Sequence, residues 1–464
     1  MSMRTLVLGL TVLCLCACGG GDSPSPLTQE VAVPPVVDTG TETSNPSPSV
    51  CPLAEEQSWL RQHVRNTYLW NDLTPDRSPD GFTSLRTYWD SLLFQGNTVI
   101  PKDRFSSYST TETFSRYYGE GITLGYGVSV AGLEVAGQRD APLFVRYVEP
   151  KSPAANAGIR RGDEVLAMNN QLASEAVAND DFSALNAMTE GEQLSLVLKR
   201  GNDVWSVTVT SALFYLTPVQ HPQVFQTSRG AVGYVYVQSM TSQTESRLQE
   251  AFARFRQEAV SDVILDLRYN GGGLVSVGGR LASYVAGSYG QGQVYAELKY
   301  NAQQSNRNQR YTFSNPGGWS GLTRVMVLAG RRTCSASEQL INGLRGIGVQ
   351  VTVFGETTCG KPVGSSPTAN CGNTFSLVNF TSVNRLGFGG YFDGFSPTCS
   401  VPDDVRMPLG HPQEGLLAAA LSFAETRICP SRPPSAQARA AAPRARIQTK
   451  PEPGSIQDMI PDRP

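Results

Sequence analysis

The stretch "DVILDLRYNGGG" (Asp262–Gly273) joins a continuous apolar run to three consecutive glycines. An apolar run without polar alternation is typical of a strand that is buried on both faces of an α/β sheet. The glycines lack Cβ atoms, so the backbone amides after the strand can approach a ligand closely. A phosphate or an oxyanion would suit such amides, but the lysine and hydroxyl of a phosphate-binding loop are missing. The stretch therefore predicts an α/β layer with an oxyanion site at the end of a strand.

The sequence around this stretch alternates between strand and helix patterns over residues 216–430. "AVGYVYV" (231–237), "TRVMVLAG" (323–330) and "VQVTVFG" (349–355) have the composition of strands, and "TESRLQEAFARFRQEA" (244–259) has the periodicity of an amphipathic helix. We therefore expect a mixed α/β (α+β) core with a partly parallel sheet. Functional sites of such sheets lie at the carboxyl ends of the strands, and this is where three unusual loops are found.

The second of these loops contains "CSASEQL" (Cys334–Leu340), just before a predicted helix. Ser335 and Glu338 have the spacing of a capping box, in which each side chain bonds the other residue's backbone. The same position places a hydroxyl at a helix N-terminus, where free N–H groups and the helix dipole stabilise a developing oxyanion. Ser335 is thus a helix cap and a candidate nucleophile, with Ser337 and Cys334 as the neighbouring alternatives.

A serine nucleophile needs a base, and the chain offers few. His63, His221 and His411 are the only histidines, and none lies in a motif with an orienting carboxylate. Lys361 lies in "CGKPVG" (359–364), the third loop. A lysine can act as a base where burial lowers its pKa from about 10.4 towards 7.

The segment 119–215 resembles a PDZ domain. "SPAANAGIRRGDEVLAMNN" (152–170) matches the segment that PDZ domains carry between their binding groove and a core strand. The resemblance implies that Gly125, Tyr126 and Gly127 form the loop before the strand beside which a peptide C-terminus docks. Such docking adds a strand to an exposed sheet edge. A small sheet domain without a ligand is the alternative.

Three motifs, "ILDLRYNGGG", "CSASEQLINGL" and "GETTCGKPVG", together resemble the C-terminal processing, or tail-specific, proteases. The order of a helical N-terminal region with "DRFSSY" (103–108), a PDZ domain and a protease core is similar as well. The resemblance covers the chain from about Cys51 to Cys429. It implies a serine peptidase with a Ser/Lys dyad and without a metal or an organic cofactor.

Matched by position to the family motifs, Ser335 is the nucleophile and Lys361 is the general base. The resemblance places the oxyanion hole at the backbone amides of Gly271 or Gly272 and of Ala336.

The third member of the site is open. Many family members carry a glutamine four residues after the lysine, where this chain has Ser365. Ser365, Glu356 and Glu338 are the candidates to replace it.

Six cysteines lie beyond residue 50, namely Cys51, Cys334, Cys359, Cys371, Cys399 and Cys429. An even number in an exported chain favours disulfides, and no metal-ligand spacing is present. A disulfide such as Cys359 with Cys371 would hold the lysine loop in place. If reduced, Cys334 could compete with the serine as a nucleophile.

The first eighteen residues have the pattern of a signal peptide, because their apolar run from Leu6 to Leu15 is too short to span a membrane. "LCAC" (15–18) resembles the lipobox of bacterial lipoproteins. This implies a diacylated Cys18 and a periplasmic protein anchored to the membrane, with Gly19 suggesting the outer membrane. A plain signal peptide is the alternative.

The remaining segments are predicted from composition. Residues 19–50 predict a disordered tether, 51–118 a small helical region and 431–464 a disordered tail. The formal net charge of −2 gives no reason to expect nucleic acid as a partner.

We therefore expect an endopeptidase that recognises unstructured C-termini of exported proteins. A degenerate, non-catalytic peptide scaffold is the main alternative. A serine esterase of another fold is disfavoured because the Gly-x-Ser-x-Gly turn is missing. The sequence is compatible with a homo-oligomer.

Overall fold

The computed structural model describes residues 51–132, 142–179, 181–322 and 324–430, together with the backbone of 459–460. The predicted signal peptide, lipid anchor and tether lie outside these residues, as does the predicted tail apart from its short strand at 459–460. No helix in the described part of the chain is long and apolar enough to cross a membrane.

A six-stranded sheet with the order β10-β11-β12-β16-β17-β22 forms the centre of the C-terminal region. β10 pairs antiparallel with β11, and the other neighbours are parallel. The strands are β10 (Val219–Thr227), β11 (Gly230–Val237), β12 (Asp262–Asp266), β16 (Arg324–Ala329), β17 (Gln350–Gly355) and β22 (Cys399–Ser400). The predicted mixed α/β core is confirmed.

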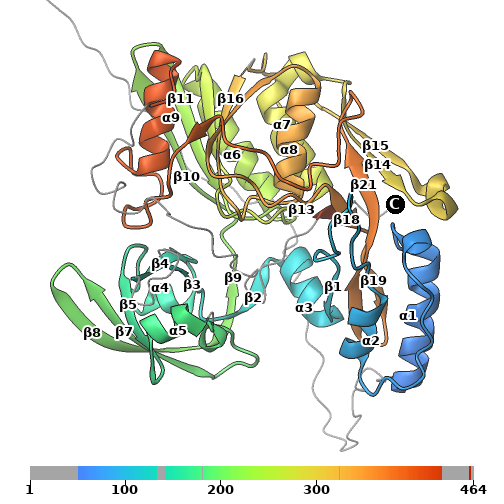
Figure 1. Cartoon of the computed structure of the whole chain (residues 1–464). Helices are drawn as coiled ribbons and strands as arrows, with labels where there is room; N and C mark the ends of the chain where they lie inside the picture. The colour runs from blue at the N-terminus through green and yellow to red at the C-terminus, as the bar shows by residue number, and fades with distance from the viewer. Residues whose placement is uncertain (1–50, 133–141, 180, 323, 431–458, 461–464) are drawn as a thin grey trace, which may run out of the picture. The chain divides into compact units, whose positions relative to one another are not determined.

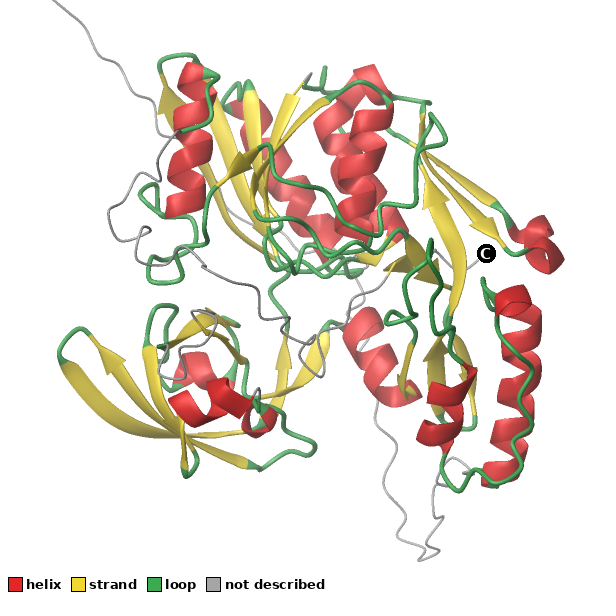
Figure 2. Cartoon of the chain, viewed as in Figure 1, coloured by secondary structure: helices red, strands yellow, loops and turns green. Residues whose placement is uncertain are grey.

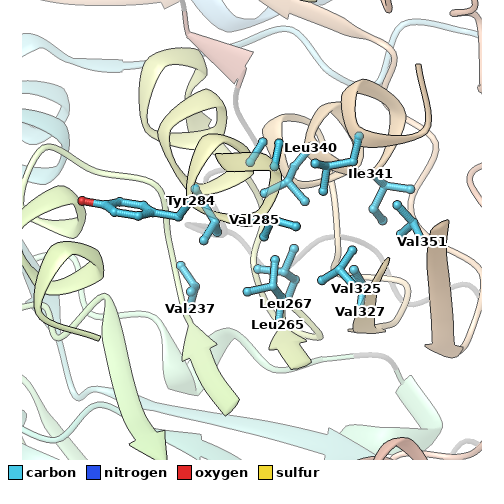
Figure 3. Packing of buried hydrophobic residues seen from close by; sticks show 14 of the residues in the cluster. Val237, Leu265, Leu267, Tyr284, Val285, Val325, Val327, Leu340, Ile341 and Val351 are labelled. Atoms are coloured by element: carbon cyan, nitrogen blue, oxygen red, sulfur yellow. The ribbon is translucent and has the colours of Figure 1, made fainter. Parts of the chain in front are cut away.

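Helices cover both faces of this sheet (Figures 1 and 2). Three helices pack on one face and α9 (Gly415–Thr426) packs on the other, because neighbouring residues of each strand point to opposite faces. In β16, Val325 and Val327 face the three-helix layer shown in Figure 3, whereas Met326 faces α9. The helices of the first layer are α6 (Thr244–Gln257), α7 (Val275–Gly290) and α8 (Ala336–Gly346). Burial on both faces explains the continuous apolar runs of the sequence.

The parallel strands β12, β16 and β17 lie side by side, so their carboxyl ends share one edge of the sheet. The glycine loop comes after β12, the serine loop after β16 and the lysine loop after β17. The prediction that these three loops meet at one edge is therefore confirmed.

The region predicted as a PDZ domain has its own sheet, of order β3-β4-β5-β7-β8, and its own apolar core. Ser152 caps α4 by accepting a hydrogen bond from the Ala155 N–H. The elements are β2 (Ile122–Gly125), β3 (Val128–Gly132), β4 (Leu143–Val148), α4 (Pro153–Asn156), β5 (Glu164–Met168), β6 (Gln171–Leu172), α5 (Ala173–Asn179), η3 (Ser183–Leu185), β7 (Gln193–Arg200), β8 (Asp203–Thr210) and β9 (Ala212–Tyr215).

The helical region 51–118 shares one core with residues 363–378, so it does not fold around a core of its own. Strand β1 pairs with β20, and a disulfide joins Cys51 to Cys371. The elements of the region are α1 (Leu53–Thr67), η1 (Asn71–Leu73), α2 (Leu85–Leu92), β1 (Ser107–Thr110), α3 (Thr111–Ser115) and η2 (Arg116–Glu120).

The remaining elements form smaller sheets beside the core. β15-β14-β21-β18 is an antiparallel sheet, β19 extends the β1–β20 pair, and β13 pairs with β23. They are β13 (Gly273–Leu274), β14 (Val294–Tyr300), η4 (Ala302–Arg307), β15 (Gln309–Thr312), β18 (Val363–Ser365), β19 (Thr368–Asn370), β20 (Asn373–Ser376), β21 (Val378–Val383) and β23 (Met459–Ile460).

A buried arginine anchors the glycine loop. The Arg268 guanidinium donates to both oxygens of Asp266 at 2.9 Å and to both oxygens of Glu414 at 2.7 and 2.8 Å. Glu414 also caps α9 by accepting from the Leu417 N–H. Because bidentate pairs fix both distance and plane, Arg268 sets the direction in which the chain leaves β12.

Candidate active site

Ser335 lies directly before α8 in a backbone conformation that few residues other than glycine adopt. Its φ is 59° and its ψ is −118°. Such a conformation costs on the order of 1–3 kcal/mol and is concentrated at functional sites. The side chain is fully buried, and its hydroxyl oxygen has no hydrogen-bond partner among the described residues. The residue is therefore held in place by its surroundings, while its hydroxyl is uncommitted.

The carboxylate of Glu338 joins the serine loop to the lysine loop. Its Oε2 accepts from the N–H of Ser335 at 3.0 Å and from the N–H of Lys361 at 2.8 Å. Its Oε1 accepts from the N–H of Gly360 at 2.8 Å and from the hydroxyl of Thr358. One oxygen atom thus fixes the backbones of the predicted nucleophile and the predicted base. The carboxylate half of the predicted capping box is present and has this second role.

Glu338 is completely buried, and burial raises the pKa of its carboxyl above the usual value. The hydrogen bonds from Thr358, Lys361, Gly360 and Ser335 act in the opposite direction, because they stabilise the ionised form. Four donors around one carboxyl group leave no room for a donor on Glu338 itself. The geometry therefore requires an acceptor at this position.

Lys361 is 1% exposed, so both members of the predicted dyad lie inside the protein. Its Nζ lies 5.8 Å from the centre of the Phe105 ring. Phe105 is positioned by Asp103, whose Oδ1 accepts from the N–H groups of Phe105 and Ser106 at 2.8 and 3.0 Å. The motif "DRFSSY" thus builds an aromatic wall for the lysine. Its proximity to the lysine could not be read from the sequence, since the two segments lie in distant parts of the chain.

The glycine loop touches the serine loop through Asn270. The Asn270 carbonyl accepts from the Cys334 N–H at 3.1 Å and from the Ser337 hydroxyl at 3.2 Å. The hydroxyl of Ser337 is therefore committed to a hydrogen bond, in contrast to that of Ser335. Sequence reasoning gave Asn270 no role, although it lies directly before the three glycines in "ILDLRYNGGG".

The predicted oxyanion amides differ in their availability. The Gly272 N–H donates to Oδ1 of Asn270 at 2.8 Å, so it is already occupied. The Gly271 N–H has no protein acceptor among the described residues. Ala336 is the first residue of α8, where a helix leaves its N–H groups without intrahelical partners. Of the two predicted glycine donors, Gly271 is therefore the one whose N–H is not occupied by Asn270.

The three candidates for the third member occupy different surroundings. Glu338 contacts both loops through its four hydrogen bonds. Glu356 is 38% exposed at its side chain and pairs with Arg331 at 3.3 Å, on the surface. Ser365 is buried in β18, and its hydroxyl has no partner among the described residues. Glu338 is thus the candidate that the structure connects to both Ser335 and Lys361.

A disulfide joins Cys334, the residue before Ser335, to Cys359, two residues before Lys361. The sequence predicted that a disulfide could hold the lysine loop, and Cys359 does form one; the example pairing with Cys371 is wrong, because Cys371 pairs with Cys51. The third pair is Cys399 with Cys429. The sulfurs of Cys334 and Cys359 also lie close to the Glu338 carboxylate, a grouping that resembles a metal site. Because these sulfurs are bonded to each other, neither offers a thiolate.

The three histidines lie elsewhere. His63 stacks on Trp59, and burial, with a smaller effect of Arg307, lowers its pKa to about 4. His221 is in a β-strand with φ of 53°, and burial lowers its pKa as well. His411 accepts from the Gln413 N–H. Within the described residues no hydrogen bond links a histidine to Ser335, which agrees with the absence of a histidine motif.

A cavity of about 460 Å³ lies next to the glycine loop. Gly271 and Gly272 line it together with Gly125, Tyr126 and Gly127, the predicted peptide-binding loop. Arg332 also lines the cavity, although no sequence motif indicates such a role. The two glycines of the predicted oxyanion site and the predicted peptide-binding loop therefore line the same cavity.

Comparison with known proteins places these features in a family. Residues 231–383 match the model of peptidase family S41, and residues 122–199 match the model of the PDZ domain. These ranges contain the glycine, serine and lysine loops and the predicted peptide-binding loop. The chain thus contains an S41 peptidase region preceded by a PDZ region, and the resemblance to the C-terminal processing proteases that its motifs predict is supported.

Individual relatives are distant. The chain is 25% identical over 318 residues to carboxyl-terminal-processing peptidase 2, chloroplastic, of Arabidopsis thaliana, covering 66% of this chain and 56% of that protein. It is 23% identical over 306 residues to a probable CtpA-like serine protease of Staphylococcus epidermidis, covering 65% and 58%. The matched part thus spans little more than half the length of these relatives. A crystal structure of a putative S41 protease from Bacteroides fragilis has the same fold, with a TM-score of 0.62 and 24% identity, over 79% of this chain and 96% of that one.

The role of Glu338 is testable by Glu338→Gln. The side-chain amide of glutamine has one oxygen acceptor and one NH₂ donor, so its NH₂ group would face backbone N–H groups that now donate to a carboxylate oxygen. At least one of these buried N–H groups would lose its acceptor, which costs about 1–3 kcal/mol. We expect kcat for peptide cleavage to fall about 10- to 100-fold. The matched control is Glu356→Gln, for which we expect kcat within about twofold of wild type, since surface ion pairs contribute little. Equal kcat values for the two variants would exclude Glu338 as the link between the loops.

The Cys334–Cys359 disulfide has a natural control in Cys399–Cys429, because the two close loops of 25 and 30 residues. Replacing either pair by alanine should cost a similar amount of stability, about 3 kcal/mol in the chain-entropy account. We expect both variants to show lower melting temperatures. Only Cys334→Ala/Cys359→Ala should lower kcat, by at least about tenfold, since a 1 Å misplacement of reacting groups can cost more than that. Equal kcat in both double variants would show that the first disulfide has a stabilising role alone.

Proposed function

We propose that this protein is a serine endopeptidase that uses Ser335 and Lys361 as a dyad. The observation that carries the proposal is the shared Glu338 carboxylate, which fixes the backbones of both residues at 3.0 and 2.8 Å. The uncommitted Ser335 hydroxyl and the unoccupied Gly271 amide, in a chain of the S41 family, support it further.

The proposed reaction is acyl transfer in two steps. The Ser335 hydroxyl attacks the scissile carbonyl while Lys361 accepts its proton, and the amides of Gly271 and Ala336 donate to the oxyanion. Lys361 returns the proton to the leaving amine, and an acyl-enzyme remains on Ser335. Lys361 then takes a proton from water, which attacks the ester, and returns this proton to the departing Ser335 oxygen, so that the new carboxylate is released and the hydroxyl is restored.

The proposed substrates are exported proteins with unstructured C-termini. The loop Gly125–Gly127 precedes β3, and a peptide added beside this strand would gain main-chain hydrogen bonds. The cavity that this loop shares with Gly271 supports a path from recognition to cleavage. The names of the relatives, a carboxyl-terminal-processing peptidase and a CtpA-like serine protease, agree with this substrate class.

The dyad is tested by incubating wild type, Ser335→Ala, Lys361→Ala and Ser337→Ala with β-casein, an unstructured protein, and measuring its cleavage. We expect at least about a 10³-fold loss for the first two variants, since members of a catalytic unit are each indispensable. Ser337→Ala should retain activity within a few fold, because it removes one hydrogen bond to Asn270. Equal activity in all four proteins would refute the dyad. Cleavage by none of them would favour the non-catalytic scaffold.

We further propose that Cys18 carries a lipid, and that this lipid anchors the protein to a membrane, the outer membrane being the one that Gly19 suggests. The folded part would then lie in the periplasm. The "LCAC" sequence and the short apolar run before it support this. Wild type should sediment with membranes and incorporate labelled palmitate, whereas Cys18→Ala should do neither. The control Cys16→Ala should behave as wild type. Membrane association of Cys18→Ala equal to wild type would contradict the lipid anchor.

A further inference from the structure

Strand β13 is a short edge that begins directly after the oxyanion glycines. It consists of Gly273 and Leu274, so only Gly272 separates it from Gly271. Its first edge is occupied by Met240, which donates to the Gly272 carbonyl at 2.9 Å and accepts from the Leu274 N–H at 2.8 Å. The other edge of β13 pairs with a second strand.

The second edge is occupied by the chain's own last strand. β23 pairs parallel with β13, with Met459 opposite Gly273 and Ile460 opposite Leu274. β23 also contacts β18, which begins two residues after Lys361. Figure 1 shows this short dark-red strand beside β13 and near β18. The last strand thus lies between the segment that carries the oxyanion glycines and the segment that carries the lysine.

An extended peptide in this position lies beside the segment that carries the predicted oxyanion glycine. Its backbone pairs with Gly273 and Leu274, two and three residues after Gly271. Pairing with a sheet edge uses main-chain groups and does not depend on the peptide's sequence, which suits a peptidase for unstructured chains. The same edge can hold a substrate or β23, but not both at once.

The connection to the body of the protein allows this docking. Residues 431–458 join α9 and its disulfide to β23, and an extended chain covers roughly 3.3 Å per residue. A segment of the same chain is present at a fixed ratio of one per active site, so strand pairing within one molecule does not depend on the protein concentration.

We propose that Met459–Ile460 occupies the substrate strand position beside β13, so that the chain carries its own competing peptide. This rests on the proposed peptidase function. The occupant is the segment of this chain that contains Met459 and Ile460, bound through backbone pairing. Substrate then enters only when this segment leaves, which raises KM and leaves kcat unchanged.

The kinetic test uses the full chain with Met459→Pro/Ile460→Pro, because proline removes the backbone N–H groups that a strand needs. The matched control is Ile447→Pro/Gln448→Pro, which places the same two prolines in the same tail outside β23. With β-casein as substrate, we expect the first variant to lower KM about tenfold at unchanged kcat, as for a segment bound about 90% of the time. The control should match wild type. Equal KM in all three proteins overturns the proposal.

A binding test separates this proposal from catalysis itself. The probe is a fluorescent peptide of residues 455–464, amidated at its C-terminus so that it lacks the carboxylate that a PDZ domain would bind. It should bind Ser335→Ala/Met459→Pro/Ile460→Pro and be displaced by unlabelled β-casein, and it should bind Ser335→Ala with the intact tail at least about tenfold more weakly.

The two tests distinguish the two possible failures. If β-casein is cleaved in a Ser335-dependent manner but KM is unchanged and the peptide does not bind, the tail proposal fails and the peptidase proposal stands. If no variant cleaves β-casein but the peptide binds with the expected difference in affinity, the tail proposal stands and the peptidase proposal fails. A peptide carrying prolines at 459 and 460 should not bind, and equal binding of this peptide also overturns the tail proposal.

Discussion

The carboxylate of Glu338 is the constraint on which the geometry of the site depends. It is completely buried and accepts four hydrogen bonds, from the backbones of Ser335, Gly360 and Lys361 and from the side chain of Thr358. Hydrogen bonds to a charged group are worth about 1.5–3 kcal/mol each, which offsets the cost of burying a carboxylate. Because these donors come from two loops at neighbouring strand ends, the loops keep one fixed separation.

The third loop is fixed by a different interaction. Arg268 pairs with Asp266 and Glu414, and so joins the end of β12 to the start of α9. Asn270 then links the glycine loop to the serine loop through the hydrogen bond from the Cys334 N–H. The serine loop therefore lies between two buried carboxylate systems, with Glu338 on its lysine side and the Arg268 pairs on its glycine side.

Much of this arrangement could be predicted from local sequence. Apolar runs without polar alternation predicted a sheet that is covered by helices on both faces. The glycines and the S-x-x-E spacing predicted the loops at the ends of two of its strands. Contacts between distant segments could not be predicted in this way. The disulfide partner of Cys359, the wall that Phe105 forms for Lys361, and the strand at Met459 all depend on how the chain returns in space. The positive φ of Ser335 could not be predicted either, because positive φ is expected from the sequence at glycine and not at serine.

The strain at Ser335 explains why so many interactions converge on one short loop. A conformation that costs on the order of 1–3 kcal/mol would relax if a single neutral hydrogen bond, worth about 0.5–1.5 kcal/mol, opposed it. Here the Glu338 carboxylate holds the Ser335 N–H, and Asn270 holds both Cys334 and Ser337. The disulfide of Cys334 adds a covalent restraint directly before the strained residue. Together these restraints exceed the strain, so the serine keeps its conformation while its own hydroxyl makes no stabilising contact and stays available for chemistry.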